Sequence, residues 1–183
     1  MKSQLRKEFK AMREKFTGEL RSAADRAILN EFMRTYGSNN SFFIYNSIGA
    51  EADTSALISS LLKQGKSVFL PRVEGKDMVA APYGKLKAGF GGIPEPVTKA
   101  FRGYAAVTVI PLLAINPRGY RLGYGGGFYD RYLSGAQTIK VGLGYSFQLT
   151  EKFEEDAWDQ PLDAFVCEKG IITFEKSLKG GIN

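Results

Sequence analysis

Residues 105–131 read AAVTVIPLLAINPRGYRLGYGGGFYDR, which places an apolar segment, a glycine-rich loop and a helix-like segment in direct succession. The apolar part, residues 105–115, predicts a buried strand, because almost every position is apolar. Glycines in the loop allow the positive φ angles that bring a backbone close to a ligand, and N–H groups at the start of the next helix can hold a phosphate. The succession predicts an α/β protein with an anion site after this strand.

Shorter apolar patterns on both sides extend this prediction. Residues 2–17 should form a basic helix, because apolar residues recur on one face at Leu5, Phe9, Met12 and Phe16. Further helices are expected at 19–36 and 56–63, and strands at 41–45, 66–72 (stopped by Pro71), 78–83 and 138–145, with a last strand pair after 163. Such alternation indicates an α/β three-layer sandwich with a mostly parallel sheet.

Composition limits the available chemistry. The 183 residues include one cysteine, Cys167, and no histidine, so intramolecular disulfides are impossible and imidazole is unavailable as base or ligand. Carboxylates, Lys, Arg and Tyr remain, an inventory that favours Mg²⁺ over zinc. The charged start and the absence of a long apolar run predict one cytoplasmic domain over 1–183, without signal peptide or membrane association, ending in a frayed tail at 178–183.

The net charge of +6 suits an anionic ligand, either a small molecule or a nucleic acid. Basic residues are dispersed outside the first helix, and aromatic residues do not alternate with them as an RNA-binding surface requires. A basic nucleic-acid-binding module is therefore the less favoured alternative. We expect small-molecule substrates, no nucleic acid and no obligate protein partner.

The glycine-rich segment 118–131 matches neither of two well-known phosphate motifs. No Lys-Ser or Lys-Thr pair closes it as in a Walker loop, and Phe128 stands where the dinucleotide pattern has its third glycine. Arg121 could hold phosphate oxygens in two-point contact, and Asp130 could hold Mg²⁺ directly or through water. These residues predict a site for a metal-bound polyphosphate; a bare turn before a helix is the alternative.

The segment NPRGYRLGYGGGFYDRYL, residues 116–133, closely resembles the most distinctive motif of the 5-formyltetrahydrofolate cyclo-ligases, also called 5,10-methenyltetrahydrofolate synthetases. Other motifs occur in the family's order: KSQLR at 2–6, EADT at 51–54, FLPR at 69–72, GIPEP at 92–96 and WDQPLD at 158–163. The resemblance implies the fold family of sugar-phosphate isomerases and CoA transferases. It also implies ATP- and Mg²⁺-dependent cyclisation of 5-formyltetrahydrofolate to 5,10-methenyltetrahydrofolate, with release of ADP and phosphate.

In the reaction that the resemblance implies, the formyl oxygen is phosphorylated and N10 then closes the ring, so the protein must mainly position the reactants and neutralise charge. By resemblance, Arg121 and Tyr129 should be catalytic. The expected ATP contacts are Lys2, Ser3, Gln4, Leu5, Arg6, Arg121, Leu122, Gly123, Tyr124, Gly125, Gly126, Gly127, Phe128 and Tyr129. Lys10 and Arg13 lie in the same basic stripe of the first helix but do not inherit this role.

The resemblance also implies contacts to folate and metal. Folate contacts are expected at Asn46, Glu51, Tyr124 and Phe128, and metal ligands at Asp130 and Asp159. Asp53 or Thr54, near Glu51, more simply caps a helix. The chain departs from the family pattern at Asn116, commonly Asp, at Gly91, which separates Phe90 from the Gly-Ile pair, and at Trp158, usually His. An Asn at 116 can accept the hydrogen bonds of an Asp that only braces the loop.

Residues 84–104 form a long connection, and connections of this length in compact domains are often functional lids.

The alternative to a cyclo-ligase is another phosphate- or nucleotide-using enzyme on the same scaffold, such as one similar to the sugar-phosphate isomerases. A requirement for ATP and Mg²⁺ would separate it from a cyclo-ligase.

Overall fold

The computed structural model describes residues 1–175, and the tail predicted at 178–183 lies outside the described residues. The helices are α1 (Lys2–Lys15), α2 (Gly18–Tyr36), α3 (Ser55–Lys63) and α4 (Phe128–Leu133). The main sheet contains β1 (Ser41–Ile44), β2 (Ser67–Glu74), β3 (Asp77–Pro82), β6 (Val107–Pro111), β9 (Ile139–Leu143), β10 (Ala164–Cys167) and β11 (Gly170–Thr173). Two small hairpins pair β4 (Leu86–Ala88) with β5 (Pro94–Pro96) and β7 (Ala114–Ile115) with β8 (Arg121–Leu122).

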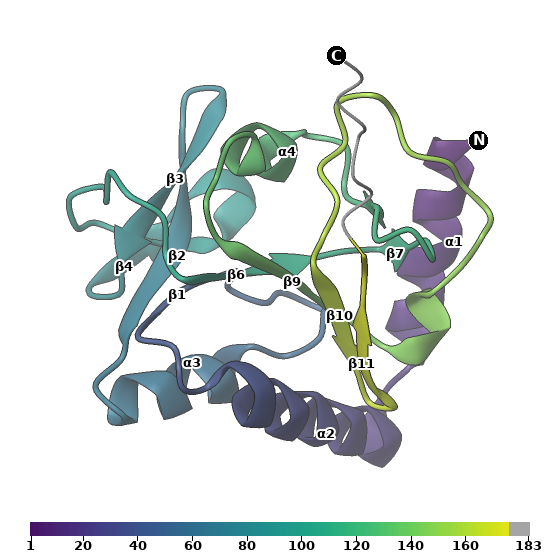
Figure 1. The fold of residues 1–183 in the computed structure, drawn as a ribbon, viewed down its shortest axis with the longest axis horizontal. Coiled ribbons are helices and arrows are strands. Elements are labelled where there is room, and N and C mark those ends of the chain that lie inside the picture. Colours follow the sequence, from purple (N-terminus) through teal and green to yellow (C-terminus); the bar gives the residue numbers. More distant parts are fainter. Residues whose placement is uncertain (176–183) are drawn as a thin grey trace.

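The centre of the molecule is a seven-stranded sheet in the order β11-β10-β9-β6-β1-β2-β3 (Figure 1). The five inner strands run parallel to one another, whereas β11 and β3 are antiparallel edge strands. The predicted mostly parallel sheet is therefore confirmed. Within residues 1–175, no helix combines the length and apolar character that crossing a membrane requires.

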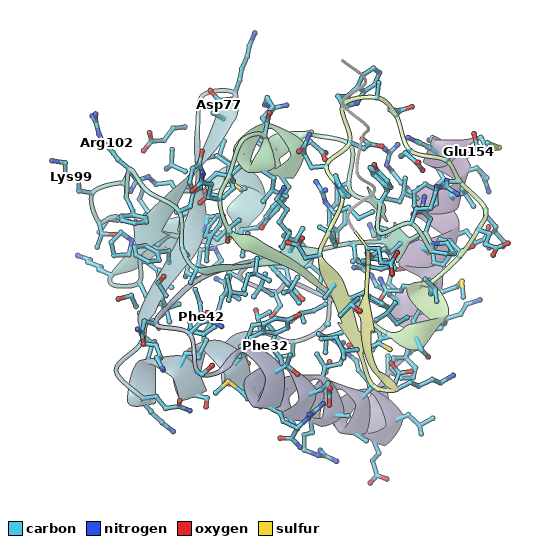
Figure 2. The ribbon with its side chains drawn as sticks, viewed as in Figure 1. Phe32, Phe42, Asp77, Lys99, Arg102 and Glu154 are labelled. Atoms are coloured by element: carbon cyan, nitrogen blue, oxygen red, sulfur yellow. The ribbon has the colours of Figure 1, made fainter. Side chains whose placement is uncertain are left out.

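Helices cover both faces of this sheet. Successive strand residues point to opposite faces, so Phe42 packs in the cluster with α2 and α3, while Phe43 packs in the cluster on the α4 side. Phe32 of α2 meets Phe42 at a ring-centroid distance of 6.1 Å, between the helix and the sheet (Figure 2). The second outer layer is thin, because the α4 that forms it has only 6 residues. Three layers nonetheless result, as the sequence predicted.

Helix α1 stands apart from the main sheet and packs on the β7–β8 hairpin through Leu5 and Phe9 (Figure 1). It ends at Lys15, slightly short of the predicted 2–17. The predicted apolar face was partly wrong: Met12 is 38% exposed, whereas Arg13 is only 4% exposed. The buried positions of α1 follow the i, i+4, i+8 spacing instead. This packing fixes α1 beside the glycine-rich segment.

Two strand predictions also need correction. The apolar segment 105–115 does not form one strand but divides into β6 and β7. Leu112 and Leu113 lie at the break, and the Gln148 side chain donates from Nε2 to both of their carbonyls at 3.0 Å. Strand β2 does not stop at Pro71 but continues to Glu74. Its pairing with β1 ends at Phe69, before Pro71. The N–H group that proline lacks is therefore not needed for a bond to β1.

The long connection 84–104 contains the β4–β5 hairpin and a short 3-10 turn at Phe90–Gly92. Glu95 anchors it: this side chain is 6% exposed, and its carboxylate accepts the N–H groups of Val73 at 3.1 Å and Phe90 at 3.2 Å. The hairpin is thereby held on β2. Whether it closes over a ligand remains a prediction.

Candidate active site

The glycine-rich segment links β8 to α4 and bends at two positions that require glycine. Gly125 has a φ of 100° and Gly127 a φ of 67°, values that side chains strongly disfavour. The first bond within α4 runs from the Arg131 N–H to the Gly127 carbonyl at 3.0 Å. The N–H groups of the first residues of α4 therefore have no acceptor inside the helix. The loop supplies the free backbone donors on which the predicted phosphate site depends.

This segment forms one wall of a cavity of about 560 Å³. The cavity lies beyond the carboxyl ends of β1 and β6, the edge at which open α/β sheets commonly bind ligands. The predicted site residues that line it are Lys2, Arg6, Asn46, Glu51, Arg121, Leu122, Gly123, Tyr124, Gly125, Gly126, Gly127, Phe128, Tyr129, Asp130 and Asp159. Ser3, Gln4 and Leu5 do not line it, since the first two are exposed and Leu5 packs against the β7–β8 hairpin.

In the wall of the cavity, Arg121 is paired with Asp130. Arg121 Nη2 lies 3.0 Å from Asp130 Oδ2, and Nη1 donates to the Gln160 carbonyl at 3.4 Å. The other carboxylate oxygen of Asp130 accepts the Gln160 N–H at 3.1 Å. The guanidinium also lies 5.9 Å from the ring centroid of Tyr129. The two predicted catalytic residues and one predicted metal ligand thus form a single contact group.

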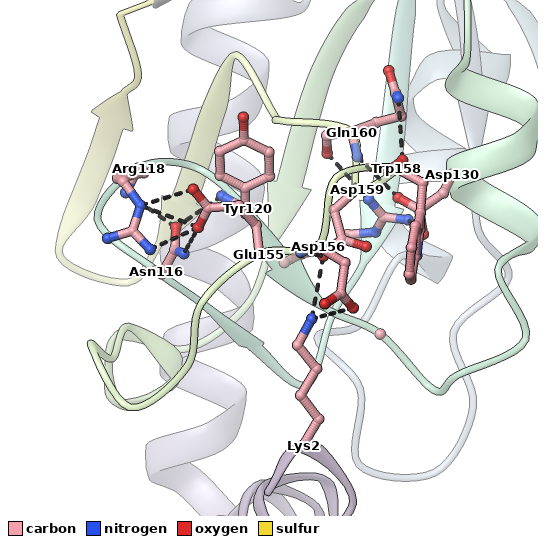
Figure 3. Close-up of polar contacts among 12 residues, drawn as sticks. Lys2, Asn116, Arg118, Tyr120, Asp130, Glu155, Asp156, Trp158, Asp159 and Gln160 are labelled. Carbon is pink, nitrogen blue, oxygen red and sulfur yellow. Dashed lines mark hydrogen bonds and ion pairs between the residues drawn. The ribbon is translucent and has the colours of Figure 1, made fainter.

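Lys2 and Arg6 enter the same cavity from α1. Lys2 Nζ lies 2.6 Å from Asp156 Oδ2 and 3.4 Å from Asp159 Oδ2 (Figure 3). Burial lowers the pKa of Lys2, but the bonds to both carboxylates outweigh it and raise that pKa. Arg6 Nε donates to the Gly123 carbonyl at 2.8 Å. The cations of α1 therefore already lie against the wall where an anion would be held.

The residues present fit Mg²⁺ only together with a polyphosphate. Among residues 1–175 no group of three or more acidic, cysteine or histidine side chains converges as a metal cage. Asp130 and Asp159 both line the cavity. Mg²⁺ in nucleotide sites is usually held by one or two carboxylates, with substrate phosphates and water completing the octahedron. This donor set matches that arrangement, and the two metal assignments remain predictions.

Glu51, which also lines the cavity, is 5% exposed and held by two donors. The Tyr124 hydroxyl donates to Oε1 at 2.6 Å, and the Ile48 N–H donates to Oε2 at 2.9 Å. Burial raises the pKa of Tyr124, and the negative charge of Glu51 raises it further. Asn46 Nδ2 donates to the Pro94 carbonyl at 3.4 Å and so links β1 to the 84–104 connection. Of the predicted folate residues, Glu51 and Tyr124 are in direct contact, while Asn46 and Phe128 line the same cavity.

The loop that carries Glu51 is braced from behind by α2. Arg21 Nη2 donates to the carbonyls of Gly49 and Glu51, both at 2.9 Å, and Arg21 Nε donates to the Tyr145 hydroxyl at 3.1 Å. Asp25 Oδ1 accepts the N–H of Asp53 at 3.2 Å, which extends the brace to the end of the loop. The expected cap of α3 has an unexpected form: Thr54 stands at the N-cap without a side-chain cap bond, while Asp53 accepts the Ser55 N–H.

Asn116 braces the glycine-rich segment, as expected if the family's Asp has only a bracing role. Its Oδ1 accepts the N–H groups of Arg118 at 3.1 Å and Tyr120 at 3.0 Å. Its Nδ2 also donates to Glu155 at 3.1 Å, a bond that a carboxylate could not make (Figure 3). Arg118 Nη2 lies 2.6 Å from Glu155 Oε2, and this pair lowers the pKa of Glu155 to about 2.

Two polar residues of the site were missed by the sequence interpretation. Asp156 holds Lys2, and Arg13 donates to the Tyr124 hydroxyl at 2.7 Å. Arg13 could have been found, because Leu5, Phe9 and Arg13 follow the spacing of a single helix face. Asp156 lies in an irregular turn next to Asp159, and no periodic signal marks it.

Comparisons with known proteins identify the family of this chain. The 5-formyltetrahydrofolate cyclo-ligase family model matches residues 1–168, which include every residue that lines the cavity. The 5-formyltetrahydrofolate cyclo-ligase of Haemophilus influenzae is 31% identical over 185 residues, covering 88% of this chain and 94% of the relative. That of Escherichia coli K12 is 36% identical over 143 residues, covering 70% and 78%.

The comparison extends to solved structures. The 5,10-methenyltetrahydrofolate synthetase of Aquifex aeolicus superposes with a TM-score of 0.85 at 32% identity, covering 98% of this chain and 97% of that one. The fold and cavity therefore define an α/β enzyme of the methenyltetrahydrofolate synthetase type. The chain belongs to the 5-formyltetrahydrofolate cyclo-ligase family. The family and enzyme class predicted from the sequence are confirmed.

Proposed function

We propose that this chain catalyses the ATP-dependent cyclisation of 5-formyltetrahydrofolate to 5,10-methenyltetrahydrofolate, with release of ADP and phosphate. The observation that carries the proposal is one cavity whose wall combines cations with a buried carboxylate. Backbone donors of the glycine-rich segment and the cations Lys2, Arg6 and Arg121 line it, and so does the buried carboxylate of Glu51. Such a cavity can hold a polyphosphate against a heterocycle that presents N–H donors.

The chemistry explains why a nucleotide is needed. The formyl oxygen attacks the γ-phosphorus of ATP, and the bond from that phosphorus to ADP breaks. N10 then attacks the activated formyl carbon and loses its proton, and the carbon–oxygen bond breaks with phosphate as the leaving group. These steps ask the protein for alignment and for donors where negative charge gathers, rather than for a histidine base.

Arg121 and the glycine-rich segment are suited to bind the phosphoryl group while it is transferred. The Arg121 side chain is 5% exposed and paired with Asp130, so its guanidinium needs little reorganisation to face a phosphate. Burial raises the pKa of Tyr129, with the charge of Glu51 adding to this effect. Tyr129 therefore stays protonated near neutral pH and would serve as a hydrogen-bond donor, not as a base.

Lys2 and Arg6 would complete the phosphate site by exchanging partners. Their present acceptors are Asp156 and the Gly123 carbonyl, and phosphate oxygens would replace these. Mg²⁺ bound with ATP would neutralise charge on the transferred group, and Asp130 and Asp159 are the residues that would hold it. The family supports ATP as co-substrate; the metal and a cytoplasmic location remain predictions.

Absorbance at the methenyl-folate band tests the proposal directly. Purified protein is mixed with 5-formyltetrahydrofolate, ATP and Mg²⁺, and each component is omitted in turn. We expect the band to grow only in the complete mixture, with ADP formed in equal amount. A folded protein that binds MgATP but produces no band would overturn the proposed reaction, and would favour another acceptor on the same scaffold.

A further inference from the structure

Arg13 of α1 is a buried cation without a direct counter-ion. It is 4% exposed, and no described acidic side chain lies within ion-pair distance of it. Its Nη1 donates to the Leu112 carbonyl at 3.1 Å, while its Nε finds no partner among the described residues. A buried charge that is left unpaired is strongly destabilising. Something nearby must compensate it.

The compensating group is Glu51, reached through the hydroxyl of Tyr124. Arg13 Nη2 donates to this hydroxyl at 2.7 Å, and the hydroxyl donates onward to Glu51 Oε1 at 2.6 Å. The Arg13 guanidinium also lies 5.6 Å from the centroid of the Tyr124 ring. Two buried and opposite charges are thus joined through one phenol. Neither Arg13 nor its backbone lines the cavity.

The direction of these bonds fixes Glu51 Oε1 as an acceptor. An arginine can only donate, so the phenol oxygen accepts from Arg13 and donates its own proton to the carboxylate. Accepting a charged donor makes the phenol a stronger donor in turn. The Glu51 side chain is therefore held in one orientation. Each of its oxygens has accepted one bond, from Tyr124 and from the Ile48 N–H, and each keeps a free lone pair.

We propose that Arg13 is a positioning residue for the folate: through Tyr124 it keeps the Glu51 side chain oriented toward the paired N–H donors of a pterin ring. The inference rests on the proposed function for the identity of the ligand. Helix α1 would then contribute to the sites of both substrates, because it also carries Lys2 and Arg6, which line the cavity and are proposed to bind the ATP phosphates. Arg13 itself touches neither substrate.

Arg13→Met provides the main test, because methionine fills the space without charge. The Leu112 carbonyl keeps a partner, the Gln148 side-chain amide at 3.0 Å, so no acceptor is orphaned. The Tyr124 hydroxyl then loses the donor that fixes its direction toward Glu51. We expect the dissociation constant for 5-formyltetrahydrofolate, measured by calorimetry without ATP, to rise about tenfold near neutral pH.

Tyr124→Phe breaks the connection while leaving Arg13 in place. It should weaken folate binding in the same direction, and the double variant should be no weaker than the weaker single variant, because both act through one path. Arg13→Lys keeps the charge and should retain more folate affinity than Arg13→Met. The matched control is Lys10→Met on the exposed side of α1, where the lysine side chain is 64% exposed. It should leave the folate affinity unchanged.

Three results would overturn the proposal: unchanged folate affinity in Arg13→Met, additive losses in the double variant, or equal loss of ATP and folate affinity, which would indicate a disturbed α1. Thermal melts establish that each variant is folded, and Tyr124→Phe carries the test if Arg13→Met does not fold. Folate binding is measured apart from turnover. A wild type that binds folate without forming the methenyl product would refute the proposed reaction while leaving the role of Arg13 open to the same binding test.

Discussion

Lys2 Nζ lies 2.6 Å from Asp156 Oδ2, although the two residues are 154 positions apart in the chain. The contact closes the cavity between the first turn of α1 and the turn before β10 (Figure 3). A partly exposed ion pair of this kind contributes little to stability. Its importance is positional, because it holds an ammonium group next to the glycine-rich segment.

Lys2→Met should therefore weaken ATP binding without weakening folate binding. We expect the KM for ATP to rise about tenfold and the KM for 5-formyltetrahydrofolate to stay within about twofold. The reason is that the lost ammonium group is proposed to contact the ATP phosphates and not the folate. Lys7→Met, an exposed lysine on the same helix that does not line the cavity, is the matched control. An equal rise in both KM values would contradict the assignment of Lys2 to ATP.

Arg121→Ala should reduce kcat about 100-fold to 1000-fold, as expected when a fixed donor to developing charge is removed. The variant should stay folded, although Asp130 loses its partner and the melting temperature should fall somewhat. Steady-state kinetics together with a thermal melt separate these effects. Turnover close to that of the wild type would exclude Arg121 from the catalytic step.

Gly125→Ala tests whether the loop must adopt a positive φ. The new methyl group has room, since its nearest neighbour is Arg6 Cζ at 3.6 Å, but the φ of 100° would be strained. We expect a loss of about 1 kcal/mol or more in the free energy of unfolding, together with weaker ATP binding. Gly75→Ala, with a φ of 63° and open space around it in the β2–β3 turn, is the matched control. It should lose stability but keep its affinity for ATP, and loss of affinity in both variants would refute a local role for Gly125.

Acid stability should depend on Glu155. Its pKa is lowered to about 2 by Arg118, so its contribution to stability is present above the ordinary carboxyl pKa, about 4.3, and is lost as the pH falls toward 2. Glu155→Gln should therefore melt at a lower temperature than the wild type near neutral pH, and the difference should shrink as the pH falls below about 4. A difference in melting temperature that does not change with pH would show that the pair with Arg118 has no electrostatic role.

Local patterns in the sequence determined most of the elements. Helix start and stop signals, such as Gly37 after Tyr36, placed α2 and α3 to within a residue or so, because such signals are local features of the chain. The apolar spacing that predicted α1 mistook its buried face, since arginine at position 13 is not expected in a core. Local patterns also missed the break between β6 and β7, which depends on a glutamine in a distant turn.

The sequence by itself determined the family, the α/β class and most of the residues that line the cavity, because the glycine-rich motif and the other short motifs are patterns of neighbouring residues. Only the tertiary structure decided which charges meet. Arg13 is linked to Glu51 through the Tyr124 hydroxyl, and Lys2 pairs with Asp156. Both contacts form because α1 packs on the β7–β8 hairpin beside the cavity. Contacts between residues so far apart in the chain depend on how whole elements pack, and no pattern within one segment encodes them.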